Sequence, residues 1–165
     1  MSEEEEIVTT EQESDAVIQP MDVQSAEEGD QVELMRISMN GEEFLMPVQD
    51  VGEILRPIDV IPVPMAPDHM LGLANVRGQI VCIIDPGKVL HLKQERAPQT
   101  EATRYLILRH ARMHLGIWVD SVSDMYRVAK NMLPQADAEN HGSSRGEIVI
   151  DDKSYNLLNT RILFD

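Results

Sequence analysis

Histidine and cysteine are the side chains most able to bind metals or act as nucleophiles, and this chain has five histidines and one cysteine. Only His110 and His114 are spaced closely enough to suggest a pair of metal ligands. The surrounding pattern predicts a turn between two strands there rather than one face of a helix, so we favour exposed turn residues over ligands. Cys82 lies in the apolar run of residues 80–84, which favours a buried thiol, and a single cysteine can form no internal disulfide.

Other arrangements that support catalysis are absent or are better explained as turns. Ser121 and Ser123 lie between two aspartates, but no histidine is near in sequence and no nucleophile elbow surrounds them. We interpret them as polar groups of a turn and a strand edge, and Asp151-Asp152 beside Lys153 as a hairpin turn. The chain also lacks a Walker-type loop and a dinucleotide-binding glycine motif. The sequence therefore predicts no catalytic residue, no metal and no cofactor.

The charge of the chain is divided unevenly along its length. The 165 residues carry 29 acidic and 14 basic side chains, a formal net charge of -15. Residues 1–30 hold 11 of the acidic side chains and no Lys or Arg, which leaves a net charge of -4 for residues 31–165. With no aromatic residue and few apolar ones, residues 1–30 are predicted to be a disordered acidic tail, followed by one domain over residues 31–165.

The same composition limits the partners and the compartment. An acidic chain repels phosphate groups, so we expect no nucleic-acid binding and no direct membrane binding. Residues 1–30 lack the positive start and the apolar stretch of a signal peptide, and no apolar run is long enough for a membrane span. Together with the single cysteine, these features predict a cytoplasmic protein.

From residue 31 onward, short apolar or alternating runs are separated by turn residues, which is typical of β-structure. Asn40-Gly41 and Arg77-Gly78 each lie between two such runs and predict tight hairpins, with Arg77 at the tip of the second. Residues 49–55 could form one helical turn that runs into a strand and stay unassigned, and a helical turn is expected within residues 88–92. The expected strands are residues 32–39, 43–48, 72–76, 79–85, 105–108, 113–119, 121–128, 146–150 and 155–159. This pattern predicts an all-β barrel or sandwich, with two hairpin-rich halves divided near residue 95.

Four stretches of this domain carry a more specific signal. In chain order they are residues 51–54 (VGEI), 72–81 (GLANVRGQIV), 83–85 (IID) and 115–124 (LGIWVDSVSD). Their residues and spacing resemble those of the CheW family of bacterial chemotaxis coupling proteins, and they cover both halves of residues 31–165. The chain departs from the family pattern at Cys82, where proline is usual, and at Pro86-Gly87, where leucine and arginine are usual.

The resemblance implies an all-β fold of two packed SH3-like five-stranded β-barrels with short helical turns. It also implies an adaptor that acts without catalysis. The groove between the barrels would hold the cytoplasmic tip of a chemoreceptor, and a CheA-type histidine kinase would dock barrel to barrel, so that the receptor biases the kinase. The Ala-Asn-Val form of the hairpin motif, with Met46-Pro47-Val48 upstream, is more similar to the adaptors of type IV pilus (twitching) chemosensory systems than to flagellar ones.

The resemblance further implies which residues bind partners. They are Arg77, Glu53, Val51, Gly72, Asn75, Gly78 and Gly116. From the residues alone, Arg77 could bind a partner carboxylate or pair internally with Glu53, and both alternatives remain open. Gly72 and Gly78 could be required only by the backbone conformation of the turn. For Val51, Ile54 and Ile58, a place in the core is favoured.

Two other hypotheses come from different classes of protein. In the first, a small-ligand-binding regulatory β-barrel contacts an anionic effector through Arg77, Arg56 and Arg104. The net charge of -4 on residues 31–165 makes this the weaker case. The second is an enzyme, which requires His114 or Cys82 to line a pocket together with another titratable group.

Overall fold

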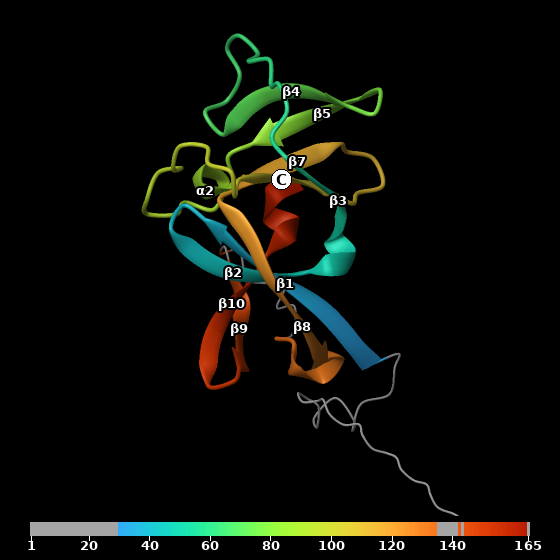
Figure 1. The fold of residues 1–165 in the computed structure, drawn as a ribbon, viewed down its shortest axis with the longest axis vertical. Helices are drawn as coiled ribbons and strands as arrows, with labels where there is room; N and C mark the ends of the chain where they lie inside the picture. Colours follow the sequence, from blue (N-terminus) through green and yellow to red (C-terminus); the bar gives the residue numbers. More distant parts are fainter. Residues whose placement is uncertain (1–29, 135–141, 143, 165) are drawn as a thin grey trace, which may run out of the picture.

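The computed structural model describes residues 30–134, 142 and 144–164, so the predicted tail lies outside the described residues except for Asp30. Within these described residues, ten strands form two five-stranded sheets, with sheet B above sheet A in Figure 1. Sheet A has the order β8-β1-β2-β10-β9 and contains β1 (Gln31–Met39), β2 (Glu42–Pro47), β8 (Ser121–Ala129), β9 (Ser144–Ile150) and β10 (Lys153–Leu158). Sheet B has the order β3-β6-β7-β5-β4 and contains β3 (Val51–Leu55), β4 (Met70–Val76), β5 (Gln79–Ile84), β6 (Arg104–Leu108) and β7 (Leu115–Val119).

Turn chemistry determines two of the hairpins. Asn40 and Gly41 have φ angles of 52° and 79°, and Arg77 and Gly78 have φ angles of 53° and 87°. Positive φ at both central residues matches the twist of two antiparallel strands, and glycine reaches it without strain. Both predicted hairpins are confirmed, because β1 pairs with β2 and β4 pairs with β5. The turn at residues 151–152 joins β9 and β10 in the same way.

The two sheets do not correspond to two halves of the chain. Sheet A takes β1 and β2 from the beginning of the domain and β8 to β10 from its end, whereas sheet B is built from β3 to β7. The expected division near residue 95 is therefore wrong. The chain returns to sheet A at Asp120, whose N–H donates to Ser38 O at 2.7 Å, because β8 continues across to pair with β1 instead of turning back on β7.

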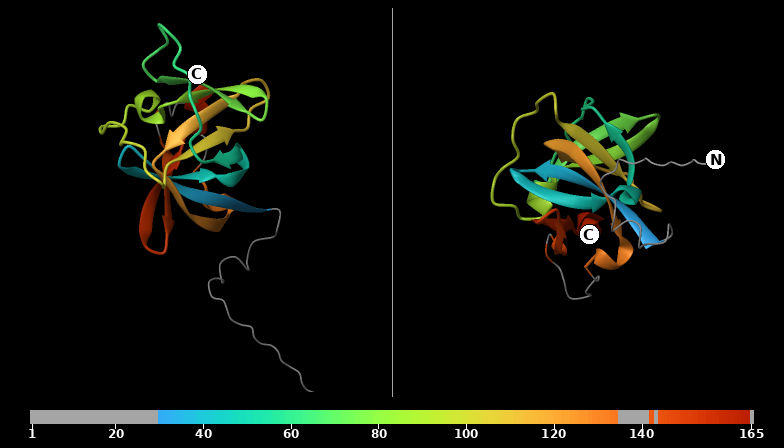
Figure 2. Two further views of the ribbon diagram at one scale, coloured as in Figure 1. Left: turned by 45° about the horizontal axis from the view of Figure 1, so that its top comes forward. Right: turned by 60° about the horizontal axis from the view of Figure 1, so that its bottom comes forward.

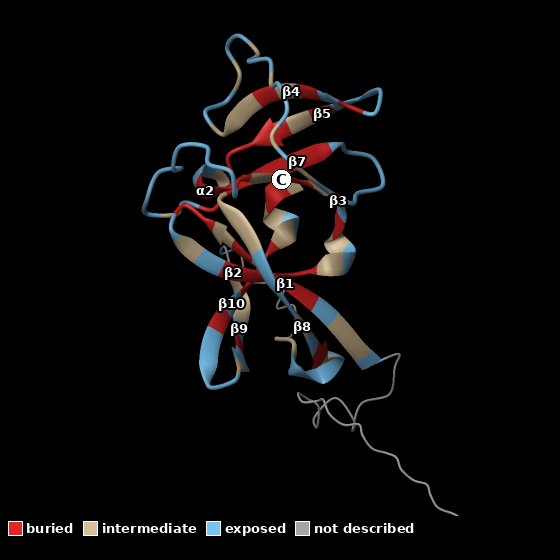
Figure 3. Ribbon diagram, viewed as in Figure 1, coloured by how far each residue is buried: buried red, intermediate tan, exposed pale blue. Residues whose placement is uncertain are grey.

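Three apolar clusters of the residues that the structure describes hold the fold together. One lies within sheet A and includes Leu34 and Leu157, and one lies within sheet B and includes Ala74 and Trp118. The third draws side chains from β1 and β2 of sheet A and from β5, β6 and β7 of sheet B, so it packs the sheets against each other (Figure 3). All five residues of β7 are buried, since this strand contributes to clusters on both of its faces. The predicted all-β fold of two packed five-stranded units is confirmed.

Short helical turns connect the strands. η3 (Val48–Asp50) leads directly into β3, and α2 (Pro86–Val89) follows β5, two residues earlier than expected. η4 (Lys130–Met132) follows β8, and η5 (Thr160–Phe164) lies between the two sheets in Figure 1, with Leu163 in the cluster that joins them. Residues 56–67 form a connection that projects beyond β4 (Figure 2). No helix of the described part is both long and apolar enough to cross a membrane.

Candidate partner-binding surface

Arg77 lies at the tip of the β4–β5 hairpin, and its guanidinium contacts the carboxylate of Glu53 on β3. Its Nε and Nη2 atoms both donate to Glu53 Oε2, at 2.8 and 2.6 Å. The side chain of Arg77 is 78% exposed and that of Glu53 is 25% exposed. The hydrogen bonds from Arg77 lower the pKa of Glu53, and the same bonds raise the pKa of Arg77. Of the two alternatives left open for Arg77, the structure contains the internal pair.

This ion pair joins the two outer strands of sheet B. β3 and β4 lie at opposite ends of the strand order, so the guanidinium spans the open side of the sheet from the hairpin tip to β3. Exposed ion pairs contribute little to stability, which points to a role in positioning the tip. A guanidinium has five N–H donors, so the exposed Arg77 keeps donors that the pair with Glu53 does not use.

The shape of the hairpin tip is set by Asn75 and Gly78. Asn75 Oδ1 accepts a hydrogen bond from the Gly78 N–H at 2.8 Å, which closes the turn. Gly78 has a φ of +87°, and a Cβ at this position would meet no atom within 4 Å. Glycine is therefore required by the backbone conformation rather than by close packing, and the space around the tip is open to a partner.

Three of the predicted partner-binding residues lie inside the structure. Val51 is 6% exposed and belongs to the cluster between the sheets. Gly72 has a φ of +146°, and a Cβ there would overlap the backbone of Ile61 in the segment bridged to β4. A Cβ on Gly116 would lie 2.7 Å from the Cδ1 atom of Ile83. These positions maintain the packing of sheet B, so a contribution to partner binding through them would be indirect.

The core interpretation holds for Val51 and is wrong for Ile54 and Ile58, whose side chains are 41% and 37% exposed. A register shift between Val51 and Glu53 in the β3–β6 pairing changes which side chains of β3 face inward. β3 is also an outer strand of sheet B, so no further strand covers Ile54. The result is an exposed apolar side chain at the residue that follows Glu53 in β3.

A second apolar surface extends outward from the cluster between the sheets. Ile84, Cys82 and Ile80 alternate along one face of β5: Ile84 is in the cluster, Cys82 packs against it, and Ile80 is 58% exposed. Leu115 of β7 pairs with Cys82, and Met113, two residues earlier, is 42% exposed. We call Ile80, Cys82 and Met113 the inter-sheet strip. The sequence did not reveal it, because the apolar run of residues 80–84 favoured a buried thiol, whereas Cys82 is only partly buried.

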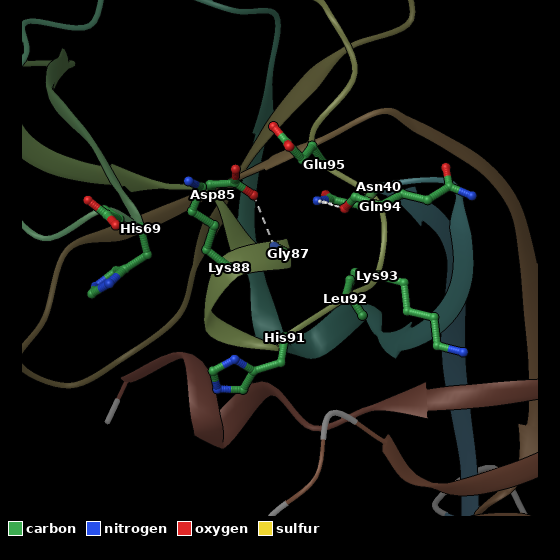
Figure 4. A pocket seen from close by; sticks show the side chains of 11 residues that line it. Asn40, His69, Asp85, Gly87, Lys88, His91, Leu92, Lys93, Gln94 and Glu95 are labelled. Atoms are coloured by element: carbon green, nitrogen blue, oxygen red, sulfur yellow. Dashed lines mark hydrogen bonds between the residues drawn. The ribbon is translucent and has the colours of Figure 1, made fainter.

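A polar cavity of about 480 Å³ lies between the β1–β2 turn, α2 and residues 91–95 (Figure 4). The ligand-binding hypothesis needs Arg56, Arg77 and Arg104, and none of them lines this cavity. The enzyme hypothesis needs His114 or Cys82, and neither lines it. In the part of the chain that the structure describes, no three His, Cys, Asp or Glu side chains are grouped so that they could hold a metal ion. The cavity therefore lends neither hypothesis support.

Comparisons with known proteins agree with this architecture. The family model described as the CheW-like domain matches residues 33–165. The chain belongs to the CheW-like domain family. A probable chemotaxis protein CheW of Rhizobium etli is 29% identical over 148 residues, which cover 86% of this chain and 92% of the relative. The chemotaxis protein CheW of Helicobacter pylori is 30% identical over 108 residues, 64% of each chain.

Two further relatives bear on the subfamily and the fold of this CheW-like domain. Protein PilI of Pseudomonas aeruginosa is 32% identical over 87 residues, which cover 53% of this chain and 48% of that protein. The crystal structure of the scaffolding protein TtCheW from Thermoanaerobacter tengcongensis matches with a TM-score of 0.66 at 21% identity, over 78% of this chain and 88% of that chain. The second match shows a shared fold.

The structure explains two departures of this CheW-like domain from the family pattern. The Cys82 N–H donates to His114 O at 3.0 Å, a bond that a proline could not make, and burial raises the pKa of the thiol. Pro86 is the first residue of α2, and the Gly87 N–H donates to Asp85 Oδ1 at 3.0 Å, so Pro86-Gly87 forms a helix start that Asp85 caps. The carboxylate of Asp85 is 3% exposed and lies 3.4 Å from Arg96 Nε, a loop arginine that supplies its counter-charge. Arg96 also lies 5.0 Å from the ring centroid of Trp118, which fastens its loop to sheet B.

Sheet A of the CheW-like domain contains a polar cluster that the sequence did not predict. Arg36 contacts Asp124 Oδ2 at 2.6 Å, and it donates to Ser123 Oγ at 2.9 Å and to the Tyr155 hydroxyl at 3.3 Å. Ser123 and Asp124 thus serve as polar groups where β8 meets β1. Burial and a hydrogen bond with Tyr155 raise the pKa of Tyr126 to about 12, whereas hydrogen bonds with Tyr126 and Arg36 lower the pKa of Tyr155.

Proposed function

We propose that this CheW-like domain is a cytoplasmic chemosensory adaptor that holds a chemoreceptor tip and a CheA-type histidine kinase in one complex through non-covalent contacts. The observation that carries the proposal is the inter-sheet strip, where an apolar cluster continues to the surface. Ile80 and Met113 are 58% and 42% exposed there. Contiguous exposed apolar side chains beside a buried core are typical of a surface that a partner covers.

The proposed receptor surface is the inter-sheet strip together with the Arg77 hairpin. β5 carries Ile80 and Cys82 of the strip and follows the hairpin tip directly, and Asn75 pairs across the hairpin with Ile80, so the open tip and the apolar strip adjoin each other. A helical receptor segment can bury one apolar face on such a strip while its polar face stays in water. Arg77 retains unused donors for a receptor carboxylate, so the internal pair and the partner contact are compatible.

The proposed kinase surface lies on β3 and the segment after it. Ile54 and Ile58 are exposed apolar side chains on this segment, and Glu53, the residue before Ile54, is held in place by Arg77. An apolar patch next to a fixed charge pair offers both contact area and orientation. Receptor and kinase would then occupy different flanks of sheet B, which is what an adaptor requires. No catalytic step is part of the proposal.

Exchange of single exposed side chains tests the receptor surface. Ile80→Ser should weaken binding of a receptor-tip fragment about tenfold or more, because burial of a large aliphatic side chain contributes roughly 1.5–3 kcal/mol. Val149→Ser is the matched control, since Val149 is 59% exposed on β9 of the other sheet. Equal affinities for the wild type and Ile80→Ser, measured by calorimetry, would remove the inter-sheet strip from the proposal.

The same design tests the kinase surface. Ile54→Ser should weaken binding of the kinase regulatory domain and leave receptor binding unchanged, with Val149→Ser again as the control. Loss of both activities in Ile54→Ser alone would mean that the two surfaces are not separate.

We also propose a type IV pilus system as the setting, on the basis of the Ala-Asn-Val hairpin motif, with the similarity to PilI as support. Relatives named CheW match at comparable identity, so the proposal of a pilus system rests on the hairpin motif. Binding of the pilus-system kinase in preference to the flagellar kinase of the same organism would agree with it. The reverse preference would contradict it.

A further inference from the structure

The connection between β6 and β7, residues 109–114, presents positive charge beside the inter-sheet strip. It contains Arg109, Arg112 and two histidines but no carboxylate, and all six of its residues are exposed. Among the described residues, neither arginine side chain forms an ion pair. Met113, a member of the inter-sheet strip, belongs to this same connection. We call residues 109–114 the basic connection.

Internal contacts hold the basic connection in one conformation. His110 Nδ1 accepts hydrogen bonds from the N–H groups of Arg112 and Met113, at 3.2 and 3.1 Å. The ring of His110 stacks on Phe164, with 4.4 Å between the centroids, so the connection rests on η5. The neighbouring Asp50 offers its carboxylate to Thr160 Oγ1 at 3.2 Å. The two arginines are therefore presented to solvent on a fixed backbone.

The chain contains a segment that complements this surface. Residues 3–15 carry seven carboxylates, and no Lys or Arg occurs before Arg36. The four glutamates of residues 3–6 are followed directly by Ile7 and Val8, an acidic stretch next to an apolar pair. The basic connection also combines the two kinds of side chain, since Arg112 directly precedes the exposed Met113.

The segment can reach the basic connection. The 22 residue steps from Val8 to Asp30 span up to about 75 Å when extended, and about 25 Å as a root-mean-square coil distance. Figure 1 shows the start of β1 and the gold connection that leads to β7 on the same side of the molecule. The length of chain before β1 therefore allows docking without any change in the described fold.

We propose that residues 3–8 dock on the basic connection of the same chain, with the glutamates at Arg109 and Arg112 and the apolar pair over Met113. The link makes the encounter intramolecular, so weak contacts suffice at an effective concentration in the millimolar range. Docking would cover part of the inter-sheet strip. The acidic segment would then compete with the receptor for this strip. This consequence rests on the proposed function, whereas the docking itself does not.

A spin label tests the docking directly in the full-length protein. Thr10→Cys in a Cys82→Ala background places one label next to the segment, and amide NMR signals report which residues it approaches. At about 10 mM salt, where charges interact over about 30 Å, the signals of residues 109–114 should be broadened. At about 1 M salt, where the screening length is about 3 Å, the broadening should fall at least about threefold.

Charge variants decide whether the basic connection is the docking surface. Arg109→Gln with Arg112→Gln should remove the broadening. Lys88→Gln with Lys93→Gln, which replaces an exposed cation within α2 and another shortly after it, should leave the broadening unchanged. Unchanged signals elsewhere in each spectrum confirm that the variants are folded. The proposal is overturned if residues 109–114 are not broadened at low salt, if the arginine variant broadens like the wild type, or if both variants lose the effect equally. No partner protein is used, so the result is independent of the adaptor function.

Discussion

Replacement of Gly87 by alanine tests whether the two sheets are held in a fixed relation. Gly87 lies in α2, directly after sheet B, and it is buried against the side-chain amide of Asn40 in the β1–β2 turn of sheet A. A Cβ on Gly87 would lie 2.6 Å from Asn40 Oδ1 and closer still to its Nδ2, well inside ordinary van der Waals contact. Asn40 is 2% exposed and its Nδ2 donates to Gln94 O at 2.9 Å, so the amide cannot turn away freely.

Two opposing effects determine how much Gly87→Ala changes the free energy of unfolding. Alanine is favoured over glycine in a helix by about 1 kcal/mol at most, and α2 has only four residues, so this gain is small. The overlap can be relieved in two alternative ways: strain of the packed atoms, which costs about 1–3 kcal/mol, or displacement of Asn40, which loses a hydrogen bond worth about 1 kcal/mol. Gly87→Ala should therefore lower the free energy of unfolding by about 1–2 kcal/mol.

A double-mutant cycle separates this contact from general damage to the helix. Asn40→Gly removes the amide and keeps a residue suited to the positive φ of the turn, at a cost of about 1 kcal/mol for the lost hydrogen bond. In that background Gly87→Ala should be neutral or stabilising, which gives a coupling free energy of about 1–2 kcal/mol. Urea unfolding followed by the fluorescence of Trp118, the single tryptophan, measures each variant. Equal destabilisation by Gly87→Ala in both backgrounds would refute the contact.

Three further predictions follow from the side-chain environments. Because Arg77 lowers the pKa of Glu53, the pair stabilises the fold above the ordinary value of 4.5 and loses its effect as the pH falls through the lowered pKa. Wild type and Glu53→Gln should therefore differ slightly in urea midpoint at neutral pH and converge in strong acid; a difference that grows in acid contradicts this. In an alkaline absorbance titration, one tyrosine should ionise below pH 10 and another at about 12, assigned to Tyr155 and Tyr126. Identical titration of all three tyrosines would contradict the hydrogen-bonded pair. Cys82 is partly buried and this burial raises the pKa of its thiol, so a disulfide reagent should modify the native thiol more slowly than the urea-unfolded one. Equal rates would place the thiol at the open surface.

Local chemistry explains why the hairpins could be predicted from the sequence. Asn40-Gly41 and Arg77-Gly78 encode their turns within two residues, and the flanking runs have the period of a strand. The division near residue 95 failed because β8 pairs with β1, a strand about 90 residues earlier, and nothing in residues 121–129 records that partner. Pairing between distant strands depends on the complete sheet.

The sequence likewise predicted only the local features of the candidate surface. The hairpin motif identified Arg77 and offered its pair with Glu53 as one of two alternatives. The exposure of Ile54 depends on a register shift in the β3–β6 pair, and the inter-sheet strip depends on the parallel pairing of β5 with β7. Both are properties of strand registers, which the alternation of apolar residues within one strand cannot specify.

The most direct test of the adaptor is whether it bridges its two partners. A receptor-tip fragment, the kinase regulatory domain and this CheW-like domain, all from one organism, can be mixed pairwise and together and analysed by size-exclusion chromatography with light scattering. We predict a ternary complex that contains receptor fragment and kinase only when the CheW-like domain is present, and that Ile80→Ser removes the receptor fragment while the kinase stays bound. A CheW-like domain that binds neither partner, or a receptor–kinase complex that forms equally well without it, would contradict the account.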